Sequence, residues 1–578
     1  MKKFKIIGLL SLIFMTVGCD SILDKGPLDT FTNDNFWISE NNVQGYANAF
    51  YESFAGYGNS GGSGDYYFKT LSDDQAGSSF ADWTHTSIPA SDATKWNNRW
   101  KEIRRANILL EHVDGITSMN ATAKSHWGGV ARLMRAWTYY HLVRTYGDVP
   151  WVNKSLNITD AGYLYSERAK RDVVMDSVLN DLNYACDNIP NTTSRTTFSQ
   201  DVAYAMKAEI CLYEGTFRKY RLAADNQPEP DLSGSTKYLT AAKEACAAIM
   251  NKSNYSLNAS YQGNYNSIDL SSNKEMIFYK AYKVDILMHS LIDYTSSSTQ
   301  MSGMTKDAFD SYLFTDGKPL GLTSEDKNDA ASIHFGTKTV AGKVVGDTVL
   351  SLHKVLAVRD ARLSQTIDTA LCYVSRGFTR FNTGISMTSS SGYGVAKFDN
   401  QSIDLQHRSQ TAANYTHAPL FWLSEIYLEY AEACAELGTA TQNDLDLSIN
   451  KLKKRAGLPN LSVNVGFSDP ANTIGVSNLV WEIRRERRCE LMFDNNLRYW
   501  DLIRWHQLDK LDSSTNPNIL IGADIVNDSY DTAVSRIGNY INASNGKTRV
   551  YDKKNYLYPI PSDQLSLNPK LGQNPGWN

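Results

Sequence analysis

One apolar helical stretch constrains the fold of this chain more than any other feature. It reads RLMRAWTYYHLVRTYGDVPW over Arg132–Trp151. Apolar side chains recur at helical spacing over a wide arc, and Gly147 and Pro150 end the pattern. A helix with such an arc must be covered by other helices. We therefore expect its aromatic residues, such as Trp137 and Tyr140, to lie in the core and not in a ligand platform.

Other helical patterns surround this stretch. The predicted helices cover Asn41–Phe54, Trp96–Leu110, Val130–Tyr146, Arg171–Asn188, Ser199–Phe217, Tyr238–Met250, Leu420–Leu437, Asp444–Ala456 and Leu479–Trp505. The earlier ones alternate at a spacing of about 34 residues, which is similar to tetratricopeptide pairs. Such pairs stack side by side because none buries its apolar face alone. The predicted fold is mainly α, with stacked tetratricopeptide-like helical pairs and a loop-rich region containing short strands.

The middle of the chain, 251–411, lacks this regularity. It is rich in Ser, Thr, Gly and Asn, with short alternating runs at Met276–Tyr282, Thr337–Val345 and Tyr393–Phe398. We expect loops, small strands and a few short helices there, one of them near Lys306–Leu313. Long irregular stretches in a compact protein are usually functional. We predict a single domain over 19–578, made of a helical part (19–250), this loop-rich middle (251–411) and a second helical part (412–578).

The first residues carry the pattern of a secretory signal. MKKFKIIGLLSLIFMTVGC has a positively charged start, a short apolar run and small residues before Cys19. The run is too short to span a membrane, and no later stretch reaches about 18 apolar residues. Small residues before a cysteine are similar to a bacterial lipobox. We predict a signal peptide at 1–18 and a lipid-modified Cys19, with an incidental cysteine after an ordinary signal as the alternative.

Composition argues against several functional classes. The formal net charge is -4 and no long Lys/Arg run occurs, which argues against nucleic acid as a partner. The six remaining cysteines lack metal-ligand spacing, so we expect buried free thiols. The 10 histidines show no paired spacing, and HExxH and GxxxxGKS are absent from the sequence. We predict no catalytic residue, no cofactor and no metal site.

The Leu479–Trp505 stretch contains the one arrangement of acids at a catalytic spacing. Glu486 and Glu490 lie one helical turn apart, among four arginines. Flanking arginines hold carboxylates ionised instead of raising the pKa of one of them for acid catalysis. The pattern therefore predicts an internal network of ion pairs.

A loop after the glycine-serine run YGNSGGSGD is the candidate ligand site. Sugars present apolar faces ringed by hydroxyls, which suit aromatic rings beside carboxylates and amides. Trp83 offers the largest stacking face in this loop, and ordinary loop packing is the alternative for all of it. The predicted ligand-binding residues are Tyr66, Asp73, Asp74 and Trp83, with Tyr282 and Tyr294 from the middle region as weaker candidates.

Four stretches carry a resemblance to a known family. RAWTYYHLVRTYGDVPW, HAPLFWLSEIYLEYAEACAELG, IRRERRCELMF…LRYWDLIRW and YLYPIPSDQLSLNPKLGQNPGWN resemble the SusD/RagB-family outer-membrane nutrient-binding lipoproteins. Asp494, Asn495 and Asn496 stand where the family usually has Glu-Gly-His.

The resemblance implies a function without catalysis. It implies a lipid-anchored protein on the exterior of the outer membrane, which binds an oligosaccharide non-covalently and delivers it to a SusC-like TonB-dependent transporter. Two alternatives stay open at this point: a helical-repeat scaffold that binds only protein or peptide, and a surface glycosidase.

Overall fold

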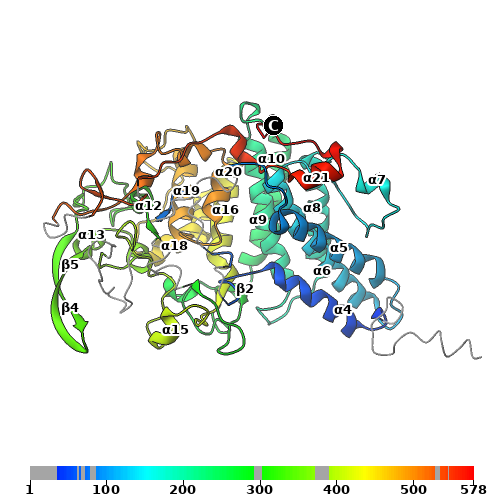
Figure 1. Ribbon diagram of the computed structural model, residues 1–578, viewed down its shortest axis with the longest axis horizontal. Helices are drawn as coiled ribbons and strands as arrows, with labels where there is room; N and C mark the ends of the chain where they lie inside the picture. The colour runs from blue at the N-terminus through cyan, green and yellow to red at the C-terminus, as the bar shows by residue number, and fades with distance from the viewer. Residues whose placement is uncertain are drawn as a thin grey trace, which may run out of the picture.

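Long helices stacked side by side form the N-terminal part of the molecule. The computed structural model describes residues 36–60, 64–66, 72–77, 86–291, 302–371, 389–527, 534–544 and 546–577. The helices are α4 (Glu40–Ala47), α5 (Asn98–Val113), α6 (Ala121–Tyr146), α8 (Arg171–Asn188), α9 (Gln200–Tyr220) and α10 (Leu232–Met250). Each packs on the next, α5 on α6, α6 on α8, α8 on α9 and α9 on α10 (Figure 1). This confirms the predicted stacking of helical pairs.

The central helix α6 shows why the stack forms where it does. The Asn120 side chain accepts a hydrogen bond from the Ala123 amide at its start, and Gly147 ends it with φ 73°. Tyr139 and Tyr146 are fully buried, and Trp137 is nearly so. The aromatic residues of this helix therefore belong to the core, as predicted.

Buried ion pairs join neighbouring helices of the stack. Arg135 on α6 binds Asp181 on α8 at 2.7 Å, and Arg171 on α8 binds Glu214 on α9 at 2.7 Å. Both carboxylates are almost completely buried. Because an unpaired buried charge is costly, these pairs favour one arrangement of the helices.

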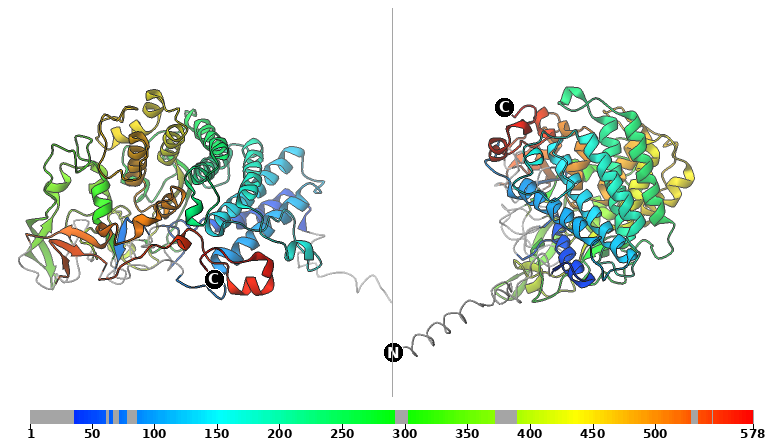
Figure 2. Two further views of the ribbon diagram at one scale, coloured as in Figure 1. Left: turned by 90° about the horizontal axis from the view of Figure 1, so that it is seen from above. Right: turned by 90° about the vertical axis from the view of Figure 1, so that its right-hand side faces the viewer.

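The stack continues into the C-terminal part of the chain. Its elements are β6 (Ala418–Trp422), α16 (Leu423–Glu436), α17 (Gln442–Leu447), α18 (Ile449–Arg455), α19 (Asn478–Glu490) and α20 (Leu497–Arg504). α16 packs on α10 and on α19, so helices from both ends of the chain lie in one series (Figure 2). One apolar core cluster runs through both parts.

Three predicted helices differ from the structure in a physically clear way. The first turn of Leu420–Leu437 is strand β6, because it pairs with β2 (Met276–Lys280) from the middle region. Asp444–Ala456 is two helices that meet at Ser448. Leu479–Trp505 is also divided, because Phe493, Asn495 and Asn496 adopt positive φ between α19 and α20.

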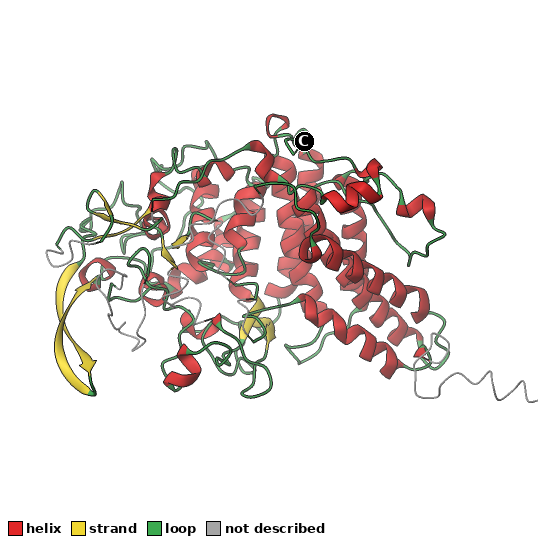
Figure 3. Ribbon diagram, viewed as in Figure 1, coloured by secondary structure: helices red, strands yellow, loops and turns green. Residues whose placement is uncertain are grey.

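The middle region contains the loops and short strands that its composition predicts. β4 (Ser332–Val340) and β5 (Lys343–Ser351) form a hairpin through Ala341 and Gly342, both with positive φ. It projects at the end of the molecule opposite α4 (Figure 3). The other elements of the middle region are β3 (Ser302–Met304), α12 (Lys306–Ser311), α13 (His353–Leu356), α14 (Ala361–Thr366) and α15 (Leu405–Ser409). Short strands outside it are β1 (Gln75–Gly77), β7 (Ile521–Asp524), β8 (Arg536–Ile537) and β9 (Tyr540–Asn542).

The structure confirms one prediction of secondary structure in the middle region and corrects another. The run Tyr393–Phe398 makes only an isolated bridge, between Val395 and Ile367, and so is not a strand. The short helix predicted near Lys306–Leu313 is confirmed as α12.

The structure also tests the predictions about the cysteines and about membrane-spanning helices. Cys186, Cys211, Cys246, Cys434 and Cys489 are free and buried, which confirms that prediction for the five. Cys372 lies outside the described residues. Within the described ranges, every helix is too short or too polar to span a bilayer.

Candidate functional site

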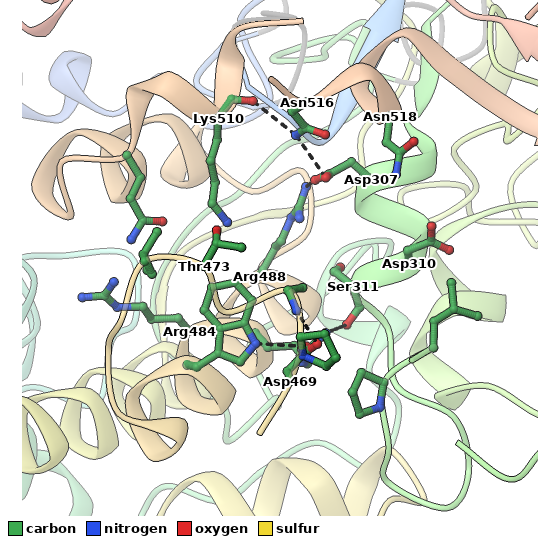
Figure 4. Close-up of a pocket in the computed structure, with 18 of the residues that line it drawn as sticks. Asp307, Asp310, Ser311, Asp469, Thr473, Arg484, Arg488, Lys510, Asn516 and Asn518 are labelled. Atoms are coloured by element: carbon green, nitrogen blue, oxygen red, sulfur yellow. Dashed lines mark hydrogen bonds and ion pairs between the residues drawn. The ribbon is translucent and has the colours of Figure 1, made fainter. Parts of the chain in front are cut away.

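A polar cavity lined by basic side chains is the candidate site. It has a volume of about 530 Å³ and lies between α12, α19, α20 and the short 3-10 helix η6 (Leu508–Leu511) (Figure 4). We call it the arginine-rich pocket. Its charged lining residues are Arg484, Arg485, Arg488, Arg498, Lys510, Asp307, Asp310, Asp469 and Asp509.

One face of α19 supplies the aromatic ring and two of the arginines. Trp481, Arg485 and Arg488 follow one another at spacings of four and three residues, which places them on one side of the helix. Ser477 caps the helix start by accepting a hydrogen bond from the Val480 amide. Trp481 is half-buried, and its indole N–H donates to Asp469 Oδ2 at 3.1 Å. One edge of the ring is therefore fixed.

Two predicted ligand residues, Asp73 and Asp74, lie behind the pocket and not in it. Arg498 binds both oxygens of Asp73, with Nε–Oδ1 at 2.8 Å and Nη2–Oδ2 at 2.6 Å. Arg488 binds Asp74 Oδ1 at 2.8 Å and Asp307 Oδ2 at 2.7 Å. Such charge-assisted forks fix the arginines in position.

The backbone around the two aspartates explains this placement. β1 follows them directly and pairs antiparallel with β3. The Thr305 amide then donates to the Asp74 carbonyl at 2.9 Å. A segment far away in the sequence is thus joined to the start of α12, beside α19.

The two carboxyl groups have different electrostatic surroundings. Burial opposes ionisation of Asp73, but Arg488 and Arg498 outweigh it and lower its pKa well below the usual value. Burial raises the pKa of Asp74, and the neighbouring negative charge of Asp73 adds to the rise. Asp73 is therefore the stronger ionic anchor of the arginines.

The structure places the two described aromatic candidates in the core, which corrects the expectation that they offer exposed stacking faces. Tyr66 is 2% exposed, and its hydroxyl donates to the Pro419 carbonyl at 2.6 Å. Tyr282 is 4% exposed, and its hydroxyl donates to the Gly58 carbonyl at 2.8 Å. Their rings pack against Tyr57. Tertiary burial, which local composition does not reveal, decides the role of these rings.

Three other predicted residues are not tested by the structure. Trp83, Tyr294 and Cys19 lie outside the described residues. Their roles in stacking and lipid attachment stay predictions.

The network predicted around Glu486 and Glu490 is confirmed, with partners that sequence analysis did not identify. Arg362 of α14 binds Glu486 at 2.6 Å and Glu490 at 2.7 Å. Arg455 of α18 also binds Glu490. Burial opposes the ionisation of Glu486, but Arg362 and Lys453 lower its pKa. These partners come from other helices, so they were not visible in the local spacing.

Several pocket residues were missed by sequence analysis. Lys510 on η6 extends into the cavity toward Thr473, Asn516 lies beside it, and Asn518 lies farther along the lining, beyond Asp307 (Figure 4). Thr473 and Asn518 are exposed, so their polar groups face solvent. The helical spacing of Trp481, Arg485 and Arg488 was the available signal, whereas the contribution of Lys510 depends on tertiary folding.

Stacked helical pairs with a loop-rich region define the class as a helical-repeat protein. Comparison with known families then gives the assignment. The SusD family profile matches residues 244–577, and a second profile, described as starch-binding associating with outer membrane, matches residues 29–212. The chain belongs to the SusD family.

Individual relatives are distant but match over nearly the full length. SusD-like protein P2 of Formosa agariphila is 23% identical over 619 residues, covering 100% of both chains. SusD-like protein P38 of the same organism is 22% identical and covers 87% of this chain and 92% of its own.

Solved structures show the same fold. A SusD-like carbohydrate binding protein from Bacteroides fragilis superposes with a TM-score of 0.68 at 20% identity, covering 93% of this chain and 99% of its own. A laminarin binding SusD-like protein superposes with a TM-score of 0.55 at 17% identity, covering 93% of this chain and 100% of its own.

Proposed function

We propose that the protein binds a nutrient oligosaccharide non-covalently in the arginine-rich pocket. The observation that carries the proposal is an open cavity whose lining combines the Trp481 ring with exposed hydroxyl and amide groups. Such a ring packs on the apolar face of a sugar, while Thr473 and Asn518 exchange hydrogen bonds with its hydroxyls. The volume of about 530 Å³ suits a few sugar units.

Relatives support the choice of ligand class. The Bacteroides fragilis structure is named as a carbohydrate binding protein, and another neighbour as laminarin binding. The family profile over residues 29–212 is described as starch-binding. We extend the general class, an oligosaccharide, to this chain.

A glycan-array screen of the chain lacking residues 1–19 tests the proposal, followed by calorimetry on the hits. We expect at least one oligosaccharide to bind, and Trp481→Ala to weaken that binding. Trp100→Ala is a matched control, because Trp100 is a half-buried ring of α5 that lines a different cavity. Binding that Trp481→Ala leaves unchanged would place the site elsewhere, with Trp83 and Tyr294 as the next candidates.

We also propose membrane attachment through Cys19 and delivery of the ligand to a SusC-like TonB-dependent transporter in the outer membrane, on the exterior face. Lipid attachment of two or three chains gives firm anchoring at about 0.8 kcal/mol per buried CH₂. Cys19→Ala should release the protein from membranes or leave its signal uncleaved. Normal palmitate labelling of that variant would contradict the anchor.

A second surface supports the transporter part of the proposal. An apolar cavity of about 480 Å³ lies between α5, α7 (Ala161–Leu164) and α21 (Ser562–Leu567). Leu567 is 66% exposed and Tyr165 52% exposed beside it. Exposed apolar patches mark protein contacts. Tyr165→Asp with Leu567→Asp should reduce co-purification of the transporter while glycan affinity stays unchanged.

A hydrolytic alternative would need a proton-donating carboxyl in the pocket. Burial raises the pKa of Asp310, which is the one feature in its favour. Lys306 Nζ, however, contacts both Asp310 oxygens, at 2.5 and 2.6 Å, and a paired ammonium favours the ionised form. We propose no enzymatic activity. Release of reducing sugar by the wild type that Asp310→Asn abolishes would overturn this.

A further inference from the structure

Lys510 differs from the arginines of the arginine-rich pocket in how its charge is paired. Each arginine of the pocket lining has a carboxylate partner. Two of these partners, Glu436 and Asp73, lie behind the pocket. The pairs are Arg484 with Glu436 at 2.9 Å, Arg485 with Asp469, Arg488 with Asp307 at 2.7 Å and Arg498 with Asp73 at 2.6 Å. The arginines are thus neutralised by the protein itself.

Lys510 is different from these arginines. Among the described residues, its ammonium makes no hydrogen bond, and no carboxylate oxygen lies within 4.0 Å of it. Its Nζ lies over the Trp481 ring, 4.9 Å from the ring centroid. The side chain is half-buried and extends into the cavity (Figure 4).

The surroundings of Lys510 disfavour its positive charge. Burial lowers its pKa to about 8, and the neighbouring Arg498 and Arg488 add to the decrease, while Asp307 and Asp73 oppose it. A half-buried cation among other cations is costly unless something compensates it. An anionic group beside Nζ would supply that compensation.

Neighbouring groups complete a site for such an anion. Thr473 offers a hydroxyl on the side toward which Lys510 points (Figure 4). The Asn516 amide already donates to Asp307 Oδ1 at 3.1 Å, whereas Asn518 is exposed and lines the same cavity. Hydroxyl and amide N–H groups donate to carboxylate or sulfate oxygens as readily as to sugar hydroxyls.

From this geometry we infer that Lys510 forms an anion subsite, so that the preferred ligand is an acidic oligosaccharide bearing a carboxylate or sulfate. The sugar part of this inference rests on the proposed glycan binding. The anion part is independent of it. The stacking face of Trp481 would hold the ring, and the ammonium 4.9 Å from its centroid would hold the charged substituent. A neutral glycan would leave the ammonium without a counter-charge.

The first experiment tests the anion subsite without any oligosaccharide. The rate of acetylation of Lys510 by a small amine-reactive reagent is followed by peptide mass spectrometry. Sulfate or galacturonate should slow it selectively, compared with chloride or galactose at equal ionic strength. Lys170, whose side chain is 82% exposed, serves as the internal control. Equal labelling of Lys510 in all four solutions would overturn the inference.

The second experiment tests the ligand class. Binding is measured for tetragalacturonate and its methyl ester, and for a sulfated carrageenan tetrasaccharide and its desulfated form. We expect one acidic member to bind at least about tenfold tighter than its neutral partner, a difference of about 1.4 kcal/mol. Lys510→Gln should abolish the preference, while Lys510→Arg and the control Lys170→Gln keep it.

The outcomes separate this inference from the proposed function. Glycan binding in the pocket without preference for the acidic form, or a preference that survives in Lys510→Gln, refutes the anion subsite and leaves glycan binding intact. Protection of Lys510 by sulfate or galacturonate, with no glycan binding on the array, supports the subsite and refutes the proposed function. Lys510→Gln should fold normally, because it removes a cation that has no carboxylate partner among the described residues.

Discussion

Helix α19 has two charged faces that differ in how their charges are satisfied. On the inner face, Glu486 and Glu490 are completely enclosed and paired with Arg362 and Arg455. On the outer face, Arg485 and Arg488 border a cavity of about 530 Å³. The same sequence run, IRRERRCEL, therefore holds the ion-pair network on one side and lines the arginine-rich pocket on the other.

The difference teaches that charge density alone does not indicate function. Both faces carry ionised groups at helical spacing. Only the outer face adjoins open volume and a cation without a partner among the described residues, Lys510. Variants that remove single charges from each face should accordingly separate stability from binding.

The largest expected effect is on the inner face. Glu490→Gln removes the charge that faces Arg362 and Arg455, and both arginines are buried. Losing one partner of a buried pair costs roughly 3–5 kcal/mol of folding free energy. Chemical denaturation measures this, with the exposed Glu244→Gln of α10 as the control. A free energy of unfolding within error of wild type would mean that the inner network is not structural.

A smaller effect, on both stability and glycan affinity, is expected from changing Asp73, which anchors Arg498 of the pocket lining. Asp73→Asn weakens the fork that fixes Arg498, so we expect a loss of about 1.5–3 kcal/mol, typical for a charged hydrogen bond. Glycan affinity should fall as well, because Arg498 lines the pocket. The free energy of unfolding and the glycan affinity are measured on the same protein preparation. A loss of stability without any loss of affinity would show that the fork does not position the pocket.

Trp481→Ala tests the outer face for binding alone. Aromatic stacking is worth roughly 1–3 kcal/mol by analogy with nucleobases, so affinity for the screened glycan should fall about tenfold. The ring is only half-buried, so the melting temperature should change little. If the variant instead unfolds much earlier and retains its affinity, then Trp481 belongs to the structural face.

The smallest expected effect is the pH dependence of binding. Because the pKa of Lys510 is lowered to about 8, its ammonium is largely present at pH 7 and largely lost by pH 9. Affinity for an acidic glycan should fall several-fold over this interval in wild type but not in Lys510→Arg. The titrating group is faced by Arg488, Arg498, Asp307 and Asp73, and Asp509 lines the same pocket. A flat profile for wild type would remove Lys510 from the site.

Sequence analysis predicted the scaffold well and the site poorly, for physical reasons. Helical periodicity reports a buried face, so the extent of α8 and the aromatic core of α6 were accessible from local spacing. Strand β6 was read as helix because Leu420–Trp422 is equally apolar in either pattern. Its pairing with β2 is a long-range contact that periodicity does not contain.

The candidate site depends on such long-range contacts throughout. Asp73 and Asp74 were predicted to bind the ligand from local composition, whereas their arginine partners lie more than 400 positions away, as in Arg498 to Asp73 with a separation of 425. Tyr66 looked like an exposed loop aromatic, and its partner Pro419 is 353 positions away. Residues whose roles are set by distant partners cannot be assigned from local composition.

The pairing of β2 with β6 has a consequence for how this architecture can change. Lys280 lies opposite Ala418, so the two ends of the excursion formed by residues 281–417 are held together at one place. Lengthening a loop whose ends are already held together costs little, about 0.6 kcal/mol for each doubling. Segments within this excursion that make few contacts with the stack can therefore be lengthened, shortened or exchanged while the helices stay as they are. New surface loops can therefore arise on an unchanged helical scaffold, in evolution or by protein engineering.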